Sequence, residues 1–149
     1  MKFLIINGPN LNMLGIREPD LYGTLTYDGL VEYVAAEARR LGVEAEFYQS
    51  NHEGDLVTAI QQAYGRMDGI VINAGAYTHT SIAILDALKA VSLPAVEVHL
   101  SAVSERESFR QVSYAGLACC KTFAGHGFAG YRMAAEYLLA LQRGIIGGE

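Results

Sequence analysis

Short apolar runs alternate with longer amphipathic segments along most of the chain. Runs of this kind are typical of strands that are covered on both faces of a parallel sheet. They occupy residues 3–6, 43–48, 70–72, 95–98 and 117–123. We therefore expect five parallel strands.

The segments between these runs repeat their apolar residues at helical spacing. In residues 30–41 the side chains of Leu30, Val34 and Ala38 share one face, and Gly42 follows as a helix stop. Further helices are expected over residues 56–67, 82–88 and 127–143, with a short one at 105–113. Strands that alternate with helices predict an α/β fold, namely a flavodoxin-like, doubly wound five-stranded parallel sheet with helices on both faces, in three layers.

The chain shows no internal repeat and no linker, so we expect residues 1–149 to form a single domain. The one long irregular stretch is 8–24, and a structureless loop of that length usually serves function. We expect it to form a lid over an active site. Residues 144–149 are expected to form a frayed tail.

Composition narrows the class of protein. Hydrophobic residues make up 51% and the net charge is -5, with no basic run, so we expect a globular protein that binds no nucleic acid. The apolar start of the chain is too short for a signal peptide or a membrane span, which predicts a soluble cytoplasmic protein. Adjacent Cys119 and Cys120 predict buried free thiols, as suits a reducing compartment.

The sequence indicates neither a metal nor a cofactor. Its four histidines are widely spread and there is no C-x-x-C pattern, so no zinc site is expected. Residues 125–130 fit the dinucleotide pattern G-x-G-x-x-G, but no strand follows to supply the ribose-binding acid. Close helix packing explains these glycines better. A receiver domain is also disfavoured, because Asn7 and Asn73 stand where it needs acidic residues.

Polar residues gather where the predicted strands end. In open parallel sheets, ligands bind beyond these carboxyl ends. The residues there are Asn7, Asn10, Asn12, Asn51, His52, Asn73, His79, Glu97, His99 and Ser101. Glu97, His99 and Ser101 are spaced by two, so they share one side of an extended strand while Val96, Val98 and Leu100 share the other. We interpret His99 beside Glu97 as functional rather than as a satisfied core pair.

Several of the other polar residues have a structural interpretation. Asn7, Asn12 and Asn51 are expected to hold loops through bonds from side chain to backbone. His52 and His126 are taken as structural. Residues 78–81 could cap a helix. In the lid, Arg17 beside Tyr22 could lower the pKa of the phenol from near 10 and make it a general base, although a solvated loop is an equal alternative.

These residues resemble a known family, the type II 3-dehydroquinate dehydratases (type II dehydroquinases). The N-terminal signature spans residues 7–15 and continues at 17–19 and 22–23. Further blocks lie at 49–54, 73–81, 97–101, 106–107, 109–110 and 125–131. The blocks follow in the family's order and spacing over nearly the whole chain, which makes the resemblance specific.

The resemblance implies reversible dehydration of 3-dehydroquinate to 3-dehydroshikimate in the shikimate pathway, through an enolate intermediate. Tyr22 would be the general base, assisted by Arg17, and His99 the general acid, oriented by Glu97. Asn10 would stabilise the enolate through a held water.

The resemblance also implies how a small carboxylate substrate is bound. Asn73, Ser101 and the backbone of Leu100 would hold the carboxylate, and His79 and Arg110 the ring hydroxyls. Asp86 would reach the site of a neighbouring subunit, because family members assemble as homo-oligomers, trimers within dodecamers. No cofactor or metal is implied.

Two observations bear on the alternatives. The only lysines are Lys2, Lys89 and Lys121, and none lies at the carboxyl end of a strand, so a covalent imine route is disfavoured. A flavodoxin-like binding or signalling module without catalysis remains the alternative function. An inactive homologue kept for assembly is a third, and its only support is Ala102, where the family usually has asparagine.

Overall fold

The computed structural model describes residues 1–16 and 25–147. Five parallel strands form one sheet in the order β2-β1-β3-β4-β5. The strands are β1 (Lys2–Asn7), β2 (Glu44–Gln49), β3 (Gly69–Asn73), β4 (Ala95–His99) and β5 (Lys121–Ala124). The predicted parallel sheet is confirmed, with the strand order of flavodoxin-like folds.

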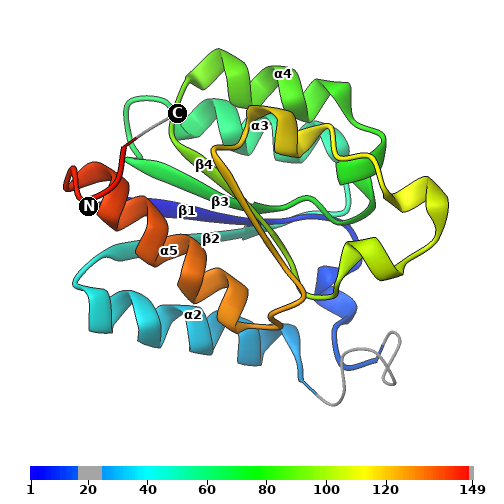
Figure 1. Ribbon diagram of the computed structural model, residues 1–149, viewed down its shortest axis with the longest axis horizontal. Helices are drawn as coiled ribbons and strands as arrows, with labels where there is room; N and C mark the ends of the chain where they lie inside the picture. The colour runs from blue at the N-terminus through cyan, green and yellow to red at the C-terminus, as the bar shows by residue number, and fades with distance from the viewer. Residues whose placement is uncertain (17–24, 148–149) are drawn as a thin grey trace.

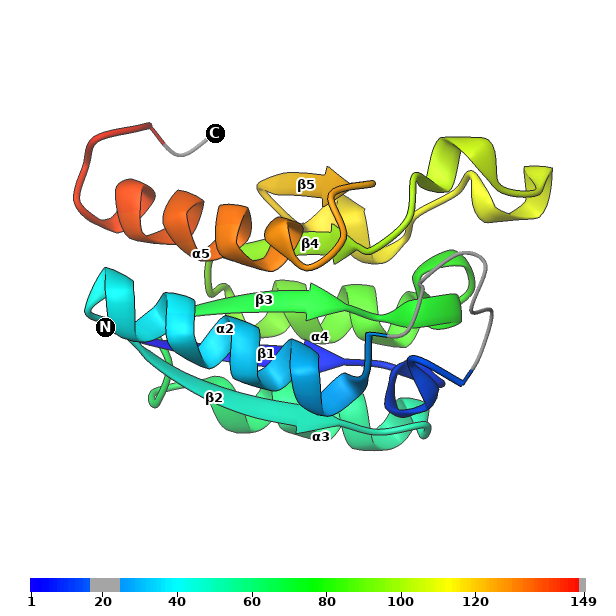
Figure 2. The ribbon, with the colours of Figure 1, turned by 90° about the horizontal axis from the view of Figure 1, so that it is seen from below.

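Helices cover both faces of this sheet (Figure 1). One layer holds α2 (Tyr27–Leu41) and α5 (Ala129–Gln142), and the other holds α3 (Glu53–Ala63) and α4 (Ile82–Val91). Figure 2 shows the strand arrows running in one direction between the two helical layers. The predicted three-layer architecture is confirmed.

The alternation along β4 places different chemistry on the two faces of the sheet. Val96, Val98 and Leu100 are buried in the core beneath α2 and α5. Glu97 and His99 therefore point to the opposite face, toward the layer of α3 and α4. This confirms the pattern expected from the spacing in the sequence.

Capping residues define where two of the helices begin. The Thr26 hydroxyl accepts a hydrogen bond from the Gly29 backbone N–H at 3.0 Å at the start of α2, and the Ser81 hydroxyl accepts one from Ile84 N–H at 3.0 Å at the start of α4. The cap expected within residues 78–81 is thus confirmed for Ser81, and it sets the direction in which the preceding loop meets the helix.

The start of one predicted strand and the form of one predicted helix were wrong. Residues 115–118 form a 3-10 helix, η5 (Ala115–Ala118), in which Leu117 is 69% exposed, and β5 begins only at Lys121. The short helix expected at 105–113 is two 3-10 turns, η3 (Val103–Glu105) and η4 (Ser108–Arg110). The Gln111 side chain bonds the carbonyls of Val103, Arg106 and Glu107, which a continuous helix would need for its own N–H groups.

The two cysteines precede β5 rather than lying within it. Both are free and half-buried, and the Cys120 thiol donates to the Ala95 carbonyl at 3.2 Å. Burial, together with the charge of Glu97, raises the pKa of the Cys119 thiol. A thiol held neutral in this way is a poor nucleophile.

The glycine motif before α5 serves packing, as expected. A Cβ at Gly130 would lie 3.1 Å from the Val98 side chain, so the helix approaches the sheet closely because this position has no side chain. Of the expected lid, residues 8–16 are described and include the 3-10 helix η1 (Leu11–Met13), while residues 17–24 lie outside the described part. Of the expected frayed tail, the structure describes Gly144 to Gly147 only.

Candidate active site

A pocket opens at the carboxyl ends of β1, β3 and β4, at the point where the strand order reverses between β1 and β3. Its lining comes from the loop after β1, from the 3-10 helix η2 (Gly75–His79), and from the segment that follows β4. The lining residues are Pro9, Asn10, Leu11, Leu14, Asn73, Gly75, Ala76, His79, His99, Leu100, Ser101, Val103, Arg106 and Arg110. This is the edge at which the sequence predicts ligand binding.

Close contact between two loops forms the base of the pocket. The Gly8 N–H donates to the Asn73 carbonyl at 2.7 Å, and a Cβ at Gly8 would lie 2.3 Å from the Ala74 carbonyl oxygen. No side chain fits in that space, which explains why the chain after β1 can lie directly on the chain after β3.

Seven of the predicted site residues line this pocket together. They are Asn10, Asn73, His79, His99, Leu100, Ser101 and Arg110. They come from segments as far apart as residues 10 and 110, so the fold and not local sequence brings them together. Arg17 and Tyr22 lie outside the described residues. Asp86 is exposed on α4 and does not line the pocket of its own chain.

His99 is backed by a buried carboxylate. Its Nε2 lies 3.3 Å from Oε2 of Glu97, and the two residues are 8% and 2% exposed. Because Nε2 faces the carboxylate, it carries a proton, and Nδ1 is the ring nitrogen left for another partner. An imidazole held in this way can exchange a proton through Nδ1 while Glu97 balances its positive form.

Hydrogen bonds keep Glu97 ionised in spite of its burial. Burial acts to raise the pKa of Glu97, but the hydrogen bond and charge of His99, together with the Ser113 and Thr122 hydroxyls, outweigh it and lower the pKa below its ordinary value. The Ser113 hydroxyl donates to Oε2 at 2.5 Å and the Thr122 hydroxyl to Oε1 at 3.0 Å. Both carboxylate oxygens are therefore satisfied.

This lowered pKa predicts how stability depends on pH. A carboxyl whose pKa is lower in the folded state stabilises the fold above its unfolded value, and this contribution is lost as the pH falls through the folded value. For Glu97 the loss falls below its ordinary value of 4.5. We expect the difference in unfolding free energy between wild type and Glu97→Gln to shrink as the pH falls through that range, measured by urea unfolding. Stability curves of wild type and Glu97→Gln that stay parallel as the pH falls would contradict it.

A buried tyrosine organises the amides beneath the pocket. The Tyr131 hydroxyl donates to Oδ1 of Asn7 at 2.6 Å and accepts from Nδ2 of Asn73 at 3.0 Å, and Tyr131 is 0% exposed. Oδ1 of Asn73 also accepts from the Gly75 N–H at 3.2 Å. The loop bond expected of Asn7 was therefore wrong, since its partner is a tyrosine in α5.

The loop role expected of Asn51 is confirmed. Its Oδ1 accepts from the Asn10 N–H at 3.0 Å and from Nε2 of Gln49 at 3.2 Å. Asn10 itself is in the left-handed region with φ 70°, which asparagine tolerates better than most residues. Nε2 of Gln49 also approaches Oδ1 of Asn12 at 3.4 Å. This cluster of amides orients the loop that carries Asn10 over the pocket.

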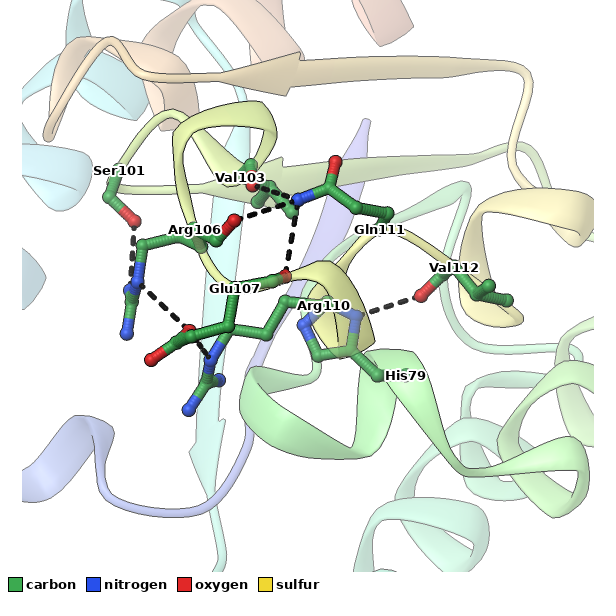
Figure 3. A network of polar contacts seen from close by, with 8 residues as sticks. All are labelled: His79, Ser101, Val103, Arg106, Glu107, Arg110, Gln111 and Val112. Carbon is green, nitrogen blue, oxygen red and sulfur yellow. Dashed lines mark hydrogen bonds and ion pairs between the residues drawn. The ribbon is translucent and has the colours of Figure 1, made fainter.

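A second network fixes the opposite wall (Figure 3). Nδ1 of His79 donates to the Val112 carbonyl at 2.7 Å, which leaves Nε2 as the ring nitrogen for another partner. Nε of Arg110 lies 2.6 Å from Oε2 of Glu107, and Nη1 of Arg106 donates to the Ser101 hydroxyl at 3.3 Å. Nε of Arg106 also lies 3.8 Å from Oε2 of Glu107, so the two guanidinium groups share one carboxylate and this wall keeps a net positive charge beside Ser101.

Arg106 is a charged pocket residue that the sequence analysis did not predict. Residues 106–107 form one of the blocks that resemble the family, but the sequence analysis gave Arg106 no role. His52 and His126 are both exposed and neither lines the pocket. Within residues 1–16 and 25–147, no group of three His, Cys, Asp or Glu side chains could hold a metal ion. No helix in those ranges is long and apolar enough to cross a membrane.

The comparisons with known proteins agree on one family. The family model described as "Dehydroquinase class II" matches residues 1–139. A 3-dehydroquinate dehydratase of Fusobacterium nucleatum is 53% identical over 142 residues, which cover 93% of this chain and 97% of that protein. One of Clostridium acetobutylicum is 50% identical and covers 89% and 92%. The crystal structure of the type II dehydroquinase from Butyrivibrio crossotus superimposes with a TM-score of 0.91 at 50% identity, over 93% of this chain and 97% of that one.

Together with these relatives, the fold and the pocket define an α/β hydro-lyase. The resemblance inferred from the sequence is confirmed. The chain belongs to the class II dehydroquinase family. The alternative of a binding or signalling module without catalysis is not supported.

Proposed function

We propose that this enzyme removes water from 3-dehydroquinate to form 3-dehydroshikimate, reversibly and through an enolate, in the shikimate pathway. The observation that carries the proposal is the convergence of seven family-matched residues on one pocket, with His99 backed by an ionised carboxylate. Dehydroquinate dehydratases that are about half identical over nearly full length support the substrate.

Proton transfer uses two residues. Tyr22, its phenolate favoured by Arg17, removes the proton next to the ketone, and Asn10 stabilises the resulting enolate through a held water. His99 gives a proton to the departing hydroxyl. Because Nε2 of His99 faces Glu97, the proton leaves from Nδ1 of an imidazolium. Neither step calls for a metal or a cofactor.

Binding uses the two walls of the pocket. Asn73, Ser101 and the Leu100 backbone hold the carboxylate, next to the guanidinium that already contacts Ser101. His79 and Arg110 hold ring hydroxyls. For the exposed Asp86 on α4 we propose a contact with the site of a neighbouring subunit, in a dodecamer of trimers. We further propose a cytoplasmic location, where this biosynthetic step takes place.

An ultraviolet assay tests the activity directly. Dehydration creates a conjugated enone, so the purified protein is expected to raise ultraviolet absorbance when 3-dehydroquinate is added, and a chelator is expected to leave the rate unchanged. Absence of turnover by a folded preparation would contradict the proposal and favour the inactive homologue.

Borohydride separates this mechanism from the covalent one. The three lysines of the chain are Lys2, Lys89 and Lys121, and none lines the described pocket. Borohydride added together with substrate is therefore expected to leave activity intact, because no imine forms for it to reduce. Inactivation with a mass increase on a lysine would show that the acid–base route is wrong.

A further inference from the structure

Behind the pocket, the carboxylate of Glu97 is held by two residues that do not line it. Ser113 lies just before η5 and Thr122 lies on β5, and each donates its hydroxyl to a different oxygen of Glu97. The contacts leave the carboxylate little freedom to turn. On the pocket side, Oε2 of Glu97 also faces Nε2 of His99 at 3.3 Å.

The fold around Ser113 is built for this contact. The Gly116 N–H of η5 donates to the Ser113 hydroxyl oxygen at 2.9 Å, which directs the hydroxyl proton toward Glu97. A Cβ at Gly116 would lie 2.9 Å from Oε1 of Glu97 and 2.8 Å from Oγ of Ser113. Only glycine lets the 3-10 helix approach the carboxylate this closely.

The register between β4 and β5 brings Thr122 into contact with Glu97. Thr122 is the Cα partner of Glu97 in the pairing of β5 with β4, so the two side chains lie next to each other on one face of the sheet. A chain of hydrogen bonds therefore runs from a backbone N–H, through Ser113 and Glu97, to the ring of His99. Thr122 holds the other side of the same carboxylate.

We propose that Ser113 and Thr122 are positioning residues that act through Glu97 to hold the His99 ring in its proton-donating orientation. The inference rests on the proposed function of His99 as the proton donor. Without the two hydroxyls, Glu97 keeps its negative charge less readily and is free to rotate away from Nε2. The imidazolium then loses both its partner and its alignment with the leaving group.

The test uses the intact enzyme and replacements that preserve side-chain shape. Ser113→Ala and Thr122→Val each remove one hydroxyl, and the double variant removes both. Thr122→Ser keeps the hydroxyl and loses only a methyl group. Thr58→Val, at an exposed position of α3, is the matched control for removing a threonine hydroxyl.

In the double variant kcat is expected to fall about tenfold, which corresponds to ~1.4 kcal/mol, while KM stays close to that of wild type. Each lost donor also raises the pKa of Glu97, so the acid limb of the kcat profile is expected to move to higher pH. The titratable groups that face Glu97 are His99 and Cys119, and the Cys119 thiol stays neutral. Thr122→Ser and Thr58→Val are expected to behave like wild type.

A crystal structure of the double variant supplies a readout that needs no substrate. The distance from Nε2 of His99 to Glu97 is expected to lengthen beyond the 3.3 Å of the parent chain. An unchanged distance, or unchanged kcat and pH profile, would overturn the inference. If the double variant fails to fold, the single variant Thr122→Val, on the exposed edge strand, tests the inference. The same kcat, pH profile and distance are measured. A folded wild-type protein that is inactive toward 3-dehydroquinate would contradict the proposed function only. The inference about Ser113 and Thr122 would still be tested, because the distance from Nε2 of His99 to Glu97 reports on positioning without substrate.

Discussion

Replacing Tyr22 with phenylalanine is expected to lower kcat at least ~100-fold, the lower end for a positioned general base. The substitution removes one hydroxyl group and keeps the aromatic ring, so binding of the substrate is expected to change little. The measurement is the ultraviolet assay of the enone product under saturating 3-dehydroquinate. The effect is expected to be confined to kcat because, in the proposed mechanism, the phenolate acts only as the carbon–hydrogen bond breaks.

The matched control is Tyr64→Phe, which removes a hydroxyl from a tyrosine that is 70% exposed at the end of α3. It is expected to leave kcat and KM unchanged. Turnover of Tyr22→Phe within a few-fold of this control would remove Tyr22 from the mechanism, and another base would have to be sought near the pocket.

Replacing Tyr131 with phenylalanine is expected to destabilise the protein by about 2–4 kcal/mol, because two buried amides each lose a partner at a cost of ~1–3 kcal/mol. The Tyr131 hydroxyl is bound to Oδ1 of Asn7 and Nδ2 of Asn73, and no solvent reaches it to compensate. Urea unfolding measures the loss. Affinity for the substrate carboxylate is also expected to weaken, because Nδ2 of Asn73 then loses this partner and the amide keeps the bond from the Gly75 N–H to its Oδ1.

Tyr137→Phe, on the same helix, is the control for this variant. Its ring packs edge-on against Phe123, and it is half-buried. Removing its hydroxyl is expected to cost less than ~1 kcal/mol, as for positions away from buried polar networks. Equal stability of the two variants would show that the amides find new partners and that Tyr131 does not organise the pocket.

The parts of the site that could be predicted are those set by strand geometry. Residues spaced by two on a strand share a face, and parallel strands end at one edge, so His99, Asn73 and Ser101 could be placed together from the sequence. The same reasoning gave the opposite face of β4 to Val98 and its neighbours, as the structure has it.

The parts that could not be predicted depend on contacts between distant segments. Ser113 and Thr122 are 16 and 25 residues from Glu97, and neither stands at the carboxyl end of a strand. Tyr131 falls on the apolar side of a helix, so a buried hydroxyl was not expected there. The partner of Asn7 lies 124 residues away, and no local rule for asparagine could identify it.

The start of β5 was misplaced for a related reason. Residues 117–123 form an apolar run, but an edge strand does not need covering on both faces, and hydropathy alone does not show where pairing with β4 begins. Pairing begins at Lys121, opposite Val96. The residues before it form η5, the element that supports Glu97 through Ser113 and Gly116.

The crossing at Gly8 sets the width of the pocket. Since the chain after β1 and the chain at the end of β3 touch there with no Cβ between them, the segments that carry Asn10 and Asn73 lie closer together than any other amino acid at position 8 would allow. Even the methyl group of alanine would clash with the Ala74 carbonyl and force the two segments apart. The absence of a side chain at Gly8 therefore determines how close these two segments lie, and any substitution at this position is expected to push them apart and widen the pocket.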